Sequence, residues 1–279
     1  MRVAIVVPSA LSAYHKKFET SYRDALTYLQ FRLDDLPFKI EMLQDLRPDK
    51  FPIDANRNHA AAQILEKGFD TSIWMDADQT FPRDFIYKLL INRHYPIVAG
   101  VYHLKYKPFY PVLLKETKGS DFKWFKPIYQ YPKEDYFYAD AIGMGAVKID
   151  RCVFEDIAKL YKKGEKIEFF RYLENPITID SIKDEDDEER KHDIKLHDKY
   201  MIRDVSEDIF FCKQVKRAGY KIVIDPTIQC GHIIEIVIDK NLSDNFYTQS
   251  MEEIKKRDLE TYKFIQENLC RVEAIKKKS

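Results

Sequence analysis

The first hundred residues alternate between short apolar runs and segments with helical spacing, and this alternation constrains the fold more than any other feature. Val3–Val7 is a continuous, β-branched run of strand length, which is typical of a strand buried on both faces of a parallel sheet. Similar runs return at Thr71–Met75 and Pro96–Val101. Alternating strands and helices indicate a parallel sheet with right-handed crossovers, so we expect an α/β fold. The intervening elements are predicted as helices at Tyr14–Leu33, Asn56–Lys67 and Pro82–Ile91 and a strand at Phe38–Leu43.

The second half of the chain is less regular. Lys183–Arg203 is dominated by charge and is predicted to be a solvated, mobile loop. The lysine-rich tail Met251–Lys278 is predicted to be helical. We therefore expect one α/β domain over residues 1–240, which includes this loop, and a helical appendage over 241–279. The remaining predicted elements are strands and loops at Tyr102–Tyr138, strands at Ala146–Ile149 and Lys221–Ile224, and helices at Arg151–Tyr161 and Ser206–Ala218.

Composition excludes several classes of protein. Hydrophobic residues make up 45% of the 279 residues, enough for a sizeable core. The 46 basic residues balance the 46 acidic ones, which removes a bulk attraction to nucleic acid or to a membrane surface. The four cysteines have no C-x-x-C spacing, so we expect free, mostly buried thiols. The N-terminal apolar run ends at Pro8, and no apolar run approaches ~20 residues. We therefore expect no signal peptide, no membrane span and a cytoplasmic location.

The strongest local signal is Asp76-Ala77-Asp78 at the end of an apolar strand. In parallel sheets ligands bind at the carboxyl ends of the strands, and the loops after Val7 and Met75 both fall there. Two carboxylates one residue apart can share Mg²⁺ or Mn²⁺, which would offset the negative charge on a diphosphate leaving group. A turn with two solvated aspartates is the alternative.

Glu207-Asp208 opens a predicted helix after Ser206. One interpretation is structural, because acidic side chains at a helix start cap it and interact favourably with its dipole. The other is catalytic, because a carboxylate here could take a proton from an acceptor hydroxyl. The dipeptide alone favours the structural interpretation.

Three further features are weaker. Arg57, at the predicted start of a helix, could bind a diphosphate or could be an ordinary surface arginine. Gly143 and Gly145 indicate either close backbone approach or a tight turn. His232 is structural unless the fold brings it beside Asp78, where its imidazole could complete an Asp/His metal site.

Taken in order, these segments resemble the nucleotide-sugar-dependent glycosyltransferases of the GT-A fold, in the broad family 2 group. The resemblance covers roughly residues 1–235 and not the tail, and the charged segment Lys183–Arg203 departs from it. It implies a Rossmann-like, mostly parallel central sheet flanked by helices. The segments that carry it are V-A-I-V-V-P-S, R-N-H-A-A-A, W-M-D-A-D-Q-T-F-P, I-V-A-G-V-Y, D-A-I-G-M-G-A, S-E-D-I-F-F-C and D-P-T-I-Q-C-G-H.

The resemblance also implies roles for residues. Asp208 matches the catalytic base, with Glu207 as its neighbour and possible substitute. Gly145 matches the floor of the site near the donor sugar. The charged segment Lys183–Arg203, which differs from the family pattern, suggests a lid over the site. The implied donor-binding residues are Pro8, Ser9, Arg57, Asp76, Ala77 and Gly145, and the implied ligands of Mn²⁺ or Mg²⁺ are Asp76, Asp78 and His232.

These assignments predict a metal-dependent glycosyltransferase, of the hexosyltransferase type, that uses Asp208 to activate an acceptor hydroxyl and inverts the anomeric centre. The resemblance makes a UDP-sugar the first choice of donor and GDP-mannose the second. A retaining glycosyltransferase, a nucleotidyltransferase and a non-catalytic nucleotide- or glycan-binding module are the alternatives. The segment P-S-A-L-S-A-Y lacks the Gly/Arg/Lys-rich phosphate loop of a nucleotidyltransferase. The acceptor stays open among protein, lipid, glycan and modified DNA.

Overall fold

The computed structural model describes residues 1–9, 14–49, 52–105, 109–116, 125–172 and 206–234, and residues 248, 251, 252, 255, 256, 259 and 263. The chain divides into two compact units, Met1–Ile233 and Ile234–Ser279, and each is considered by itself. In the second unit, the described residues from 248 onward are helical. The predicted charged loop Lys183–Arg203, and most of the predicted helical tail, lie outside the described residues.

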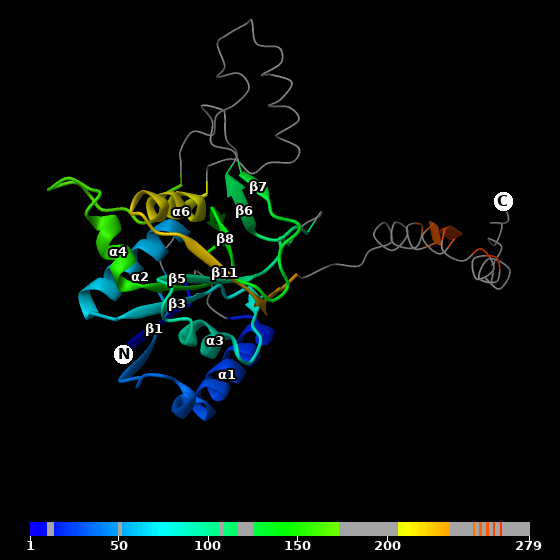
Figure 1. Ribbon diagram of the computed structural model, residues 1–279, viewed down its shortest axis with the longest axis horizontal. Coiled ribbons are helices and arrows are strands. Elements are labelled where there is room, and N and C mark those ends of the chain that lie inside the picture. Colours follow the sequence, from blue (N-terminus) through cyan, green and yellow to red (C-terminus); the bar gives the residue numbers. More distant parts are fainter. Residues whose placement is uncertain are drawn as a thin grey trace, which may run out of the picture. The chain divides into compact units, whose positions relative to one another are not determined.

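A seven-stranded sheet forms the centre of the first unit, in the order β2-β1-β3-β10-β5-β11-β8 (Figure 1). Five strands run in one direction, whereas β10 and β8 are antiparallel to their neighbours. The predicted α/β class, with a mostly parallel central sheet flanked by helices, is confirmed. The strands are β1 Arg2–Val6, β2 Met42–Leu46, β3 Thr71–Met75, β5 Ile97–Val101, β8 Phe137–Ala139, β10 Ala146–Asp150 and β11 Ile222–Gln229.

Helices cover both faces of this sheet (Figure 1). Helices α1 (Lys16–Phe31) and α3 (Phe85–Ile91) pack on one face. Helices α2 (Ile53–Lys67), α4 (Arg151–Ala158) and α6 (Glu207–Arg217) pack on the other. Apolar side chains three or four residues apart give each helix one buried stripe, so the sheet has a hydrophobic core on each side. In α1 this stripe consists of Phe18, Tyr22, Ala25 and Leu29.

Strand register brings distant segments to one edge of the sheet. Strand β1 pairs in parallel with β3, with Val6 opposite Trp74, so both strands end at the same edge. Strand β10 starts at that edge because Ala146 pairs with Met75. The backbone N–H of Asp76 then donates to the carbonyl of Gly145 over 3.0 Å.

Two smaller sheets complete the first unit. In one, β4 (Gln79–Thr80) pairs with β12 (Gly231–His232), which places His232 opposite Gln79. In the other, β6 lies between β7 and β9. The first of these sheets brings a histidine from the end of the domain beside the Asp76-Ala77-Asp78 turn. The strands of the second small sheet are β6 Leu113–Glu116, β7 Phe125–Pro127 and β9 Ala141–Ile142. Separately, a short 3-10 helix, η1, spans Leu33–Asp35.

Two sequence predictions need correction. The strand predicted at Phe38–Leu43 is in fact Met42–Leu46, an edge strand of which Met42 and Leu43 are exposed, so apolar character does not mark its position. Helix α2 starts at Ile53 rather than at residue 56, which puts Arg57 in its second turn. The helix-start argument for anion binding by Arg57 is therefore wrong.

The described cysteines are free thiols: Cys212 and Cys230 are buried, and Cys152 is exposed. Cys270 lies outside the described residues. Across the described part of the chain, we find no helix with the length and apolar character needed to cross a bilayer.

Candidate active site

A cavity of about 250 Å³ lies at the carboxyl ends of β1 and β3. Five of the six residues that the sequence suggested for donor binding line it, and Gly145 lies directly behind Asp76. The cavity forms here because β1 and β3 are adjacent and parallel, so the loops that follow them leave the sheet side by side. Its lining is Pro8, Ser9, Ile53, Arg57, Asp76, Ala77 and Asp78.

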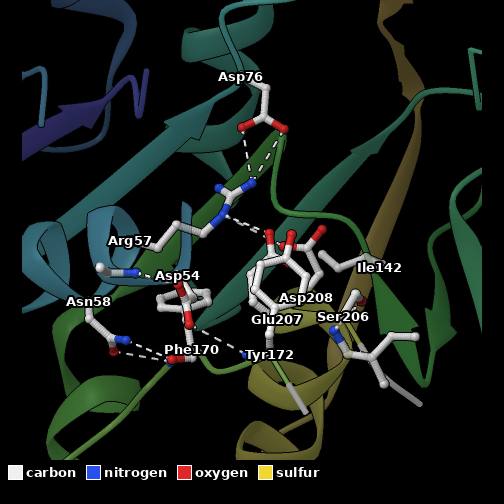
Figure 2. A network of polar contacts seen from close by, with 12 residues as sticks. Asp54, Arg57, Asn58, Asp76, Ile142, Phe170, Tyr172, Ser206, Glu207 and Asp208 are labelled. Carbon is white, nitrogen blue, oxygen red and sulfur yellow. Dashed lines mark hydrogen bonds and ion pairs between the residues drawn. The ribbon is translucent and has the colours of Figure 1, made fainter. Parts of the chain in front are cut away.

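Arg57 links this cavity to the Glu207-Asp208 pair. Its guanidinium lies between Asp76 on one side and the two acidic residues of α6 on the other (Figure 2). Nη2 is 3.2 Å from Oδ1 of Asp76, and Nε is 3.5 Å from Oε1 of Glu207 and 3.7 Å from Oδ1 of Asp208. Arg57 is only 3% exposed. We call these four residues, Arg57, Asp76, Glu207 and Asp208, the arginine cluster.

The arginine cluster contains three carboxylates and one guanidinium, and the charges are out of balance. Burial raises the pKa of Asp208 well above its ordinary value; Arg57 opposes this rise, and Glu207 and Asp76 add to it. Burial likewise raises the pKa of Asp76 against the effect of Arg57. Burial alone would lower the pKa of Arg57, but the three carboxylates raise it above its ordinary value. The cluster therefore favours a proton on one of its acids.

Helix capping does not occupy the two acidic side chains of α6. The cap is Ser206, whose hydroxyl accepts from the backbone N–H of Ile209 over 3.2 Å. Glu207 and Asp208 turn instead toward Arg57, and Met144 gives Asp208 a backbone hydrogen bond. Oδ1 of Asp208 is buried with no hydrogen-bond partner among the described residues. A buried acceptor without a partner is unfavourable by about 1–3 kcal/mol, which suggests a ligand group that donates to it.

Asp78 lies in a more open environment. His232 Nε2 is 3.5 Å from Oδ1 of Asp78, and Lys105 Nζ contacts Oδ2. Burial alone would raise the pKa of Asp78, but hydrogen bonds from His232 and Lys105 and the charge of Lys105 lower it to about 2. We call these three residues, Asp78, Lys105 and His232, the Asp78 group.

The ring orientation of His232 bears on metal binding. Its Nδ1 lies 2.7 Å from the carbonyl oxygen of His103, and because a carbonyl only accepts, Nδ1 must carry the hydrogen. With this hydrogen on Nδ1, Nε2 can donate to Asp78 only when it carries a second proton. Without that proton its lone pair faces the carboxylate, and a cation is needed between them. The donor set fits a divalent ion, and the imidazole suits Mn²⁺ better than Mg²⁺, which prefers oxygen ligands.

The third predicted ligand, Asp76, is directed to Arg57 instead. Both of its carboxylate oxygens accept from Nη2 of Arg57. Within the described ranges, no three His, Cys, Asp or Glu side chains are positioned to hold a metal together. Asp78 and His232 are thus the pair that could hold an ion, and the role of Asp76 as a ligand stays a prediction.

Two glycines allow the site residues to approach each other. A Cβ on Gly145 would lie 2.6 Å from Oδ2 of Asp76 and 2.1 Å from Nε2 of Gln79. A Cβ on Gly143 would lie 1.8 Å from the hydroxyl oxygen of Tyr102. Neither glycine has a positive φ. Close approach of side chains, rather than a tight turn, explains both glycines.

The sequence analysis missed three residues of the site: Tyr102, Tyr172 and Lys105 of the Asp78 group. Tyr102 directly follows β5, accepts a backbone hydrogen bond from Gly145 and stacks edge-on against His232, with 5.7 Å between ring centroids. Burial, Asp208 and Asp76 raise its pKa well above the ordinary value. Tyr172 hydrogen-bonds Glu207. Only Tyr102 carried a usable signal, because it follows the carboxyl end of a parallel strand.

Asn58, beside Arg57, has a structural role. Its amide nitrogen donates to the carbonyl of Phe170 over 2.6 Å, and its Oδ1 accepts from the backbone of Phe169 and Phe170. These bonds fix the segment that leads to Tyr172 (Figure 2). Asn58 is therefore engaged in holding the backbone, and it does not line the cavity beside Asp76.

A second cavity, of about 390 Å³, lies between α6, β8 and β11 and is mostly apolar. Its lysines already have partners: Lys115 pairs with Asp140, Lys216 with Glu116, and Lys221 lies over the ring of Tyr138. Asp76, Ala77 and Asp78 line the first cavity, and the candidate base Asp208 is connected to it through Arg57. The first cavity is therefore the candidate active site.

Comparisons with known proteins assign no family to this chain. No protein-family model matches the chain, and no curated protein sequence does. Among solved structures, A197 from STIV is 17% identical with a TM-score of 0.43, over 84% of this chain and 87% of that one. GalNAc-T7, solved with UDP, GalNAc and Mn²⁺, is 10% identical with a TM-score of 0.47, over 84% of this chain and 44% of that one. This chain thus spans less than half of the GalNAc-T7 structure.

Proposed function

We propose that this protein is a glycosyltransferase that moves a sugar from a nucleotide-diphosphate donor to an acceptor hydroxyl. One observation carries the proposal: the buried guanidinium of Arg57 joins the cavity beside Asp76 to the carboxylate pair Glu207–Asp208. The candidate donor pocket and the candidate base are therefore both in contact with the side chain of Arg57. The resemblance of the sequence motifs to family 2 makes a UDP-sugar the first donor to test and GDP-mannose the second.

The cavity residues would bind and orient the donor. The loop at Pro8 and Ser9 would contact the nucleotide. Arg57 would stay fixed by its carboxylates, and its Nη1, which is buried and has no hydrogen-bond partner among the described residues, would be left to donate to a ligand oxygen. Asp78 and His232 would hold a divalent ion, which when bound would stabilise negative charge on the leaving diphosphate. Gly145 keeps the floor behind Asp76 free of a side chain.

Asp208 would accept the proton of the acceptor hydroxyl. Its Oδ1 is paired with Arg57 at 3.7 Å but has no hydrogen-bond partner among the described residues, and its pKa is raised, which favours proton acceptance by this carboxylate. Glu207 is more buried and is engaged by Arg57 and Tyr172, which suits a positioning residue. Attack of the hydroxyl on the anomeric carbon opposite the leaving diphosphate would invert the configuration.

The test is the fate of the donor. UDP-glucose, UDP-N-acetylglucosamine and GDP-mannose are each incubated with the protein and Mn²⁺ or with excess chelator, and the released sugar is followed by NMR. We expect Mn²⁺-dependent release of one sugar with inverted anomeric configuration, and loss of release in Asp208→Asn. A retained configuration would overturn the inverting role of Asp208. Tight nucleotide binding without donor cleavage in the presence of simple glycoside acceptors would favour a binding module.

A further inference from the structure

Each carboxylate of the Asp76-Ala77-Asp78 turn is already paired with a cationic side chain, but the two cations differ. Arg57, on Asp76, has a side chain that is 4% exposed and fixed by further carboxylates. Lys105, on Asp78, has a side chain that is 42% exposed. A lysine ammonium on a flexible four-carbon stem can exchange partners readily, whereas a buried guanidinium cannot.

The ammonium of Lys105 contacts the carboxylate that would also bind a divalent ion. Asp78 forms part of the cavity wall, with His232 at one of its oxygens and Lys105 at the other. An ion held between Asp78 and His232 would bring two positive charges close to the ammonium, and the repulsion favours displacement of Lys105. The ammonium would remain beside the cavity, where the oxygens of a diphosphate can accept its hydrogen bonds.

We propose that Lys105 is an exchangeable cation of the donor site, which neutralises Asp78 until a divalent ion binds and then contacts the donor diphosphate. This inference rests on the proposed function and adds to it a residue and an order of events. Lys105 competes with the metal in the free protein and helps to bind the nucleotide in the metal-loaded protein. Its removal should therefore change the two affinities in opposite directions, which a purely structural ion pair would not do.

The test uses Lys105→Met, which keeps an unbranched side chain one atom shorter and removes the charge. Binding of Mn²⁺ alone is measured from the electron paramagnetic resonance of the free ion, and binding of UDP at saturating Mn²⁺ by calorimetry. We expect Mn²⁺ to bind about tenfold more tightly and UDP about tenfold more weakly than to the wild type. Lys105→Arg, which keeps the charge, should retain affinities near the wild-type values.

A matched control is Lys216→Met, which removes another exposed lysine from a carboxylate contact, with Glu116, at the second cavity. It should change neither affinity. Unchanged Mn²⁺ binding in Lys105→Met, or unchanged UDP binding, overturns the inference while leaving the proposed function standing. A wild-type protein that binds neither UDP nor GDP with Mn²⁺ overturns the proposed function and the diphosphate contact together, and this result is seen before any variant is compared.

Discussion

Asp76 and Asp78 are separated by a single residue, yet they lie in opposite electrostatic environments. Asp76 belongs to the buried arginine cluster, where one guanidinium faces three carboxylates, and its pKa is raised. Asp78 lies at the open end of the cavity with Lys105 and His232, and its pKa is lowered to about 2. Burial acts on both, so the difference arises from the number of cations available to each carboxylate.

Under the proposed function, this contrast assigns different tasks to the two aspartates of the D-x-D turn. On that proposal the arginine cluster serves proton transfer, because burial, with Glu207 and Asp76 adding to its effect, raises the pKa of Asp208. The Asp78 group is suited to cation exchange, because its carboxylate stays ionised and its partners are accessible to solvent. The following predictions test this division, from the largest expected effect to the smallest.

The largest effect is expected for Arg57→Met. Loss of the guanidinium leaves the buried Glu207 and the half-buried Asp76 and Asp208 without a counter-charge, and breaking a buried ion pair typically costs about 3–5 kcal/mol. The measurement is the free energy of unfolding in urea at pH 7. Arg57→Lys keeps the charge but loses the forked geometry of the guanidinium, so its free energy of unfolding should fall by less than that of Arg57→Met.

The pH dependence of Arg57→Met adds a second readout. Raised pKa values mean that the folded state binds more protons than the unfolded state, so the penalty grows as pH rises and is relieved as pH falls toward about 4. The deficit relative to the wild type should therefore be smaller at pH 5 than at pH 7. A deficit that is equal at both pH values would show that lost packing, rather than carboxylate repulsion, is responsible.

Asp208→Asn tests the proton-transfer half of the comparison. The amide keeps the shape and loses the proton acceptor, so kcat should fall by roughly 10²–10⁴-fold while UDP affinity stays close to the wild-type value. Glu207→Gln is the matched comparison on the same helix turn and should be milder. A larger loss of kcat in Glu207→Gln would move the base to Glu207. Near-normal turnover in both would leave the arginine cluster a structural feature.

Strand β3 and the turn after it were predictable because Thr71–Met75 is buried at every position and ends at two aspartates. The contact between Arg57 and Glu207–Asp208 was not predictable, since it depends on the packing of α2 and α6 and joins residues about 150 positions apart in the sequence. The contact of Lys105 with Asp78 was not predictable either, because Lys105 lies in an aromatic segment without helical or strand periodicity. The sequence pattern thus predicted the edge of the sheet where the site lies but not which side chains neutralise each carboxylate.

His232→Ala tests the cation-exchange half. Removal of the imidazole takes away one of the two groups that could hold the ion, so affinity for Mn²⁺ should fall by about 10–100-fold. His59→Ala is the control, because His59 contacts Gln63 on the surface of α2 and is not part of the Asp78 group. Equal affinity in the two variants would remove His232 from the metal site and leave its bond to the carbonyl of His103 as a structural contact.

The smallest effect is expected for the stability that Asp78 itself contributes. A carboxyl group with a folded pKa of about 2 and an unfolded value near 3.9 stabilises the folded state above pH ~4, and this contribution is lost as pH falls toward 2. Because the side chain is 44% exposed, solvent screens the pair and the contribution should be no more than about 1 kcal/mol. Asp78→Asn should therefore be slightly less stable than the wild type at pH 5 and indistinguishable from it at pH 2. A deficit that persists unchanged at pH 2 would mean that Asp78 stabilises the turn through its shape, and the charge contrast between the two aspartates would then not extend to folding.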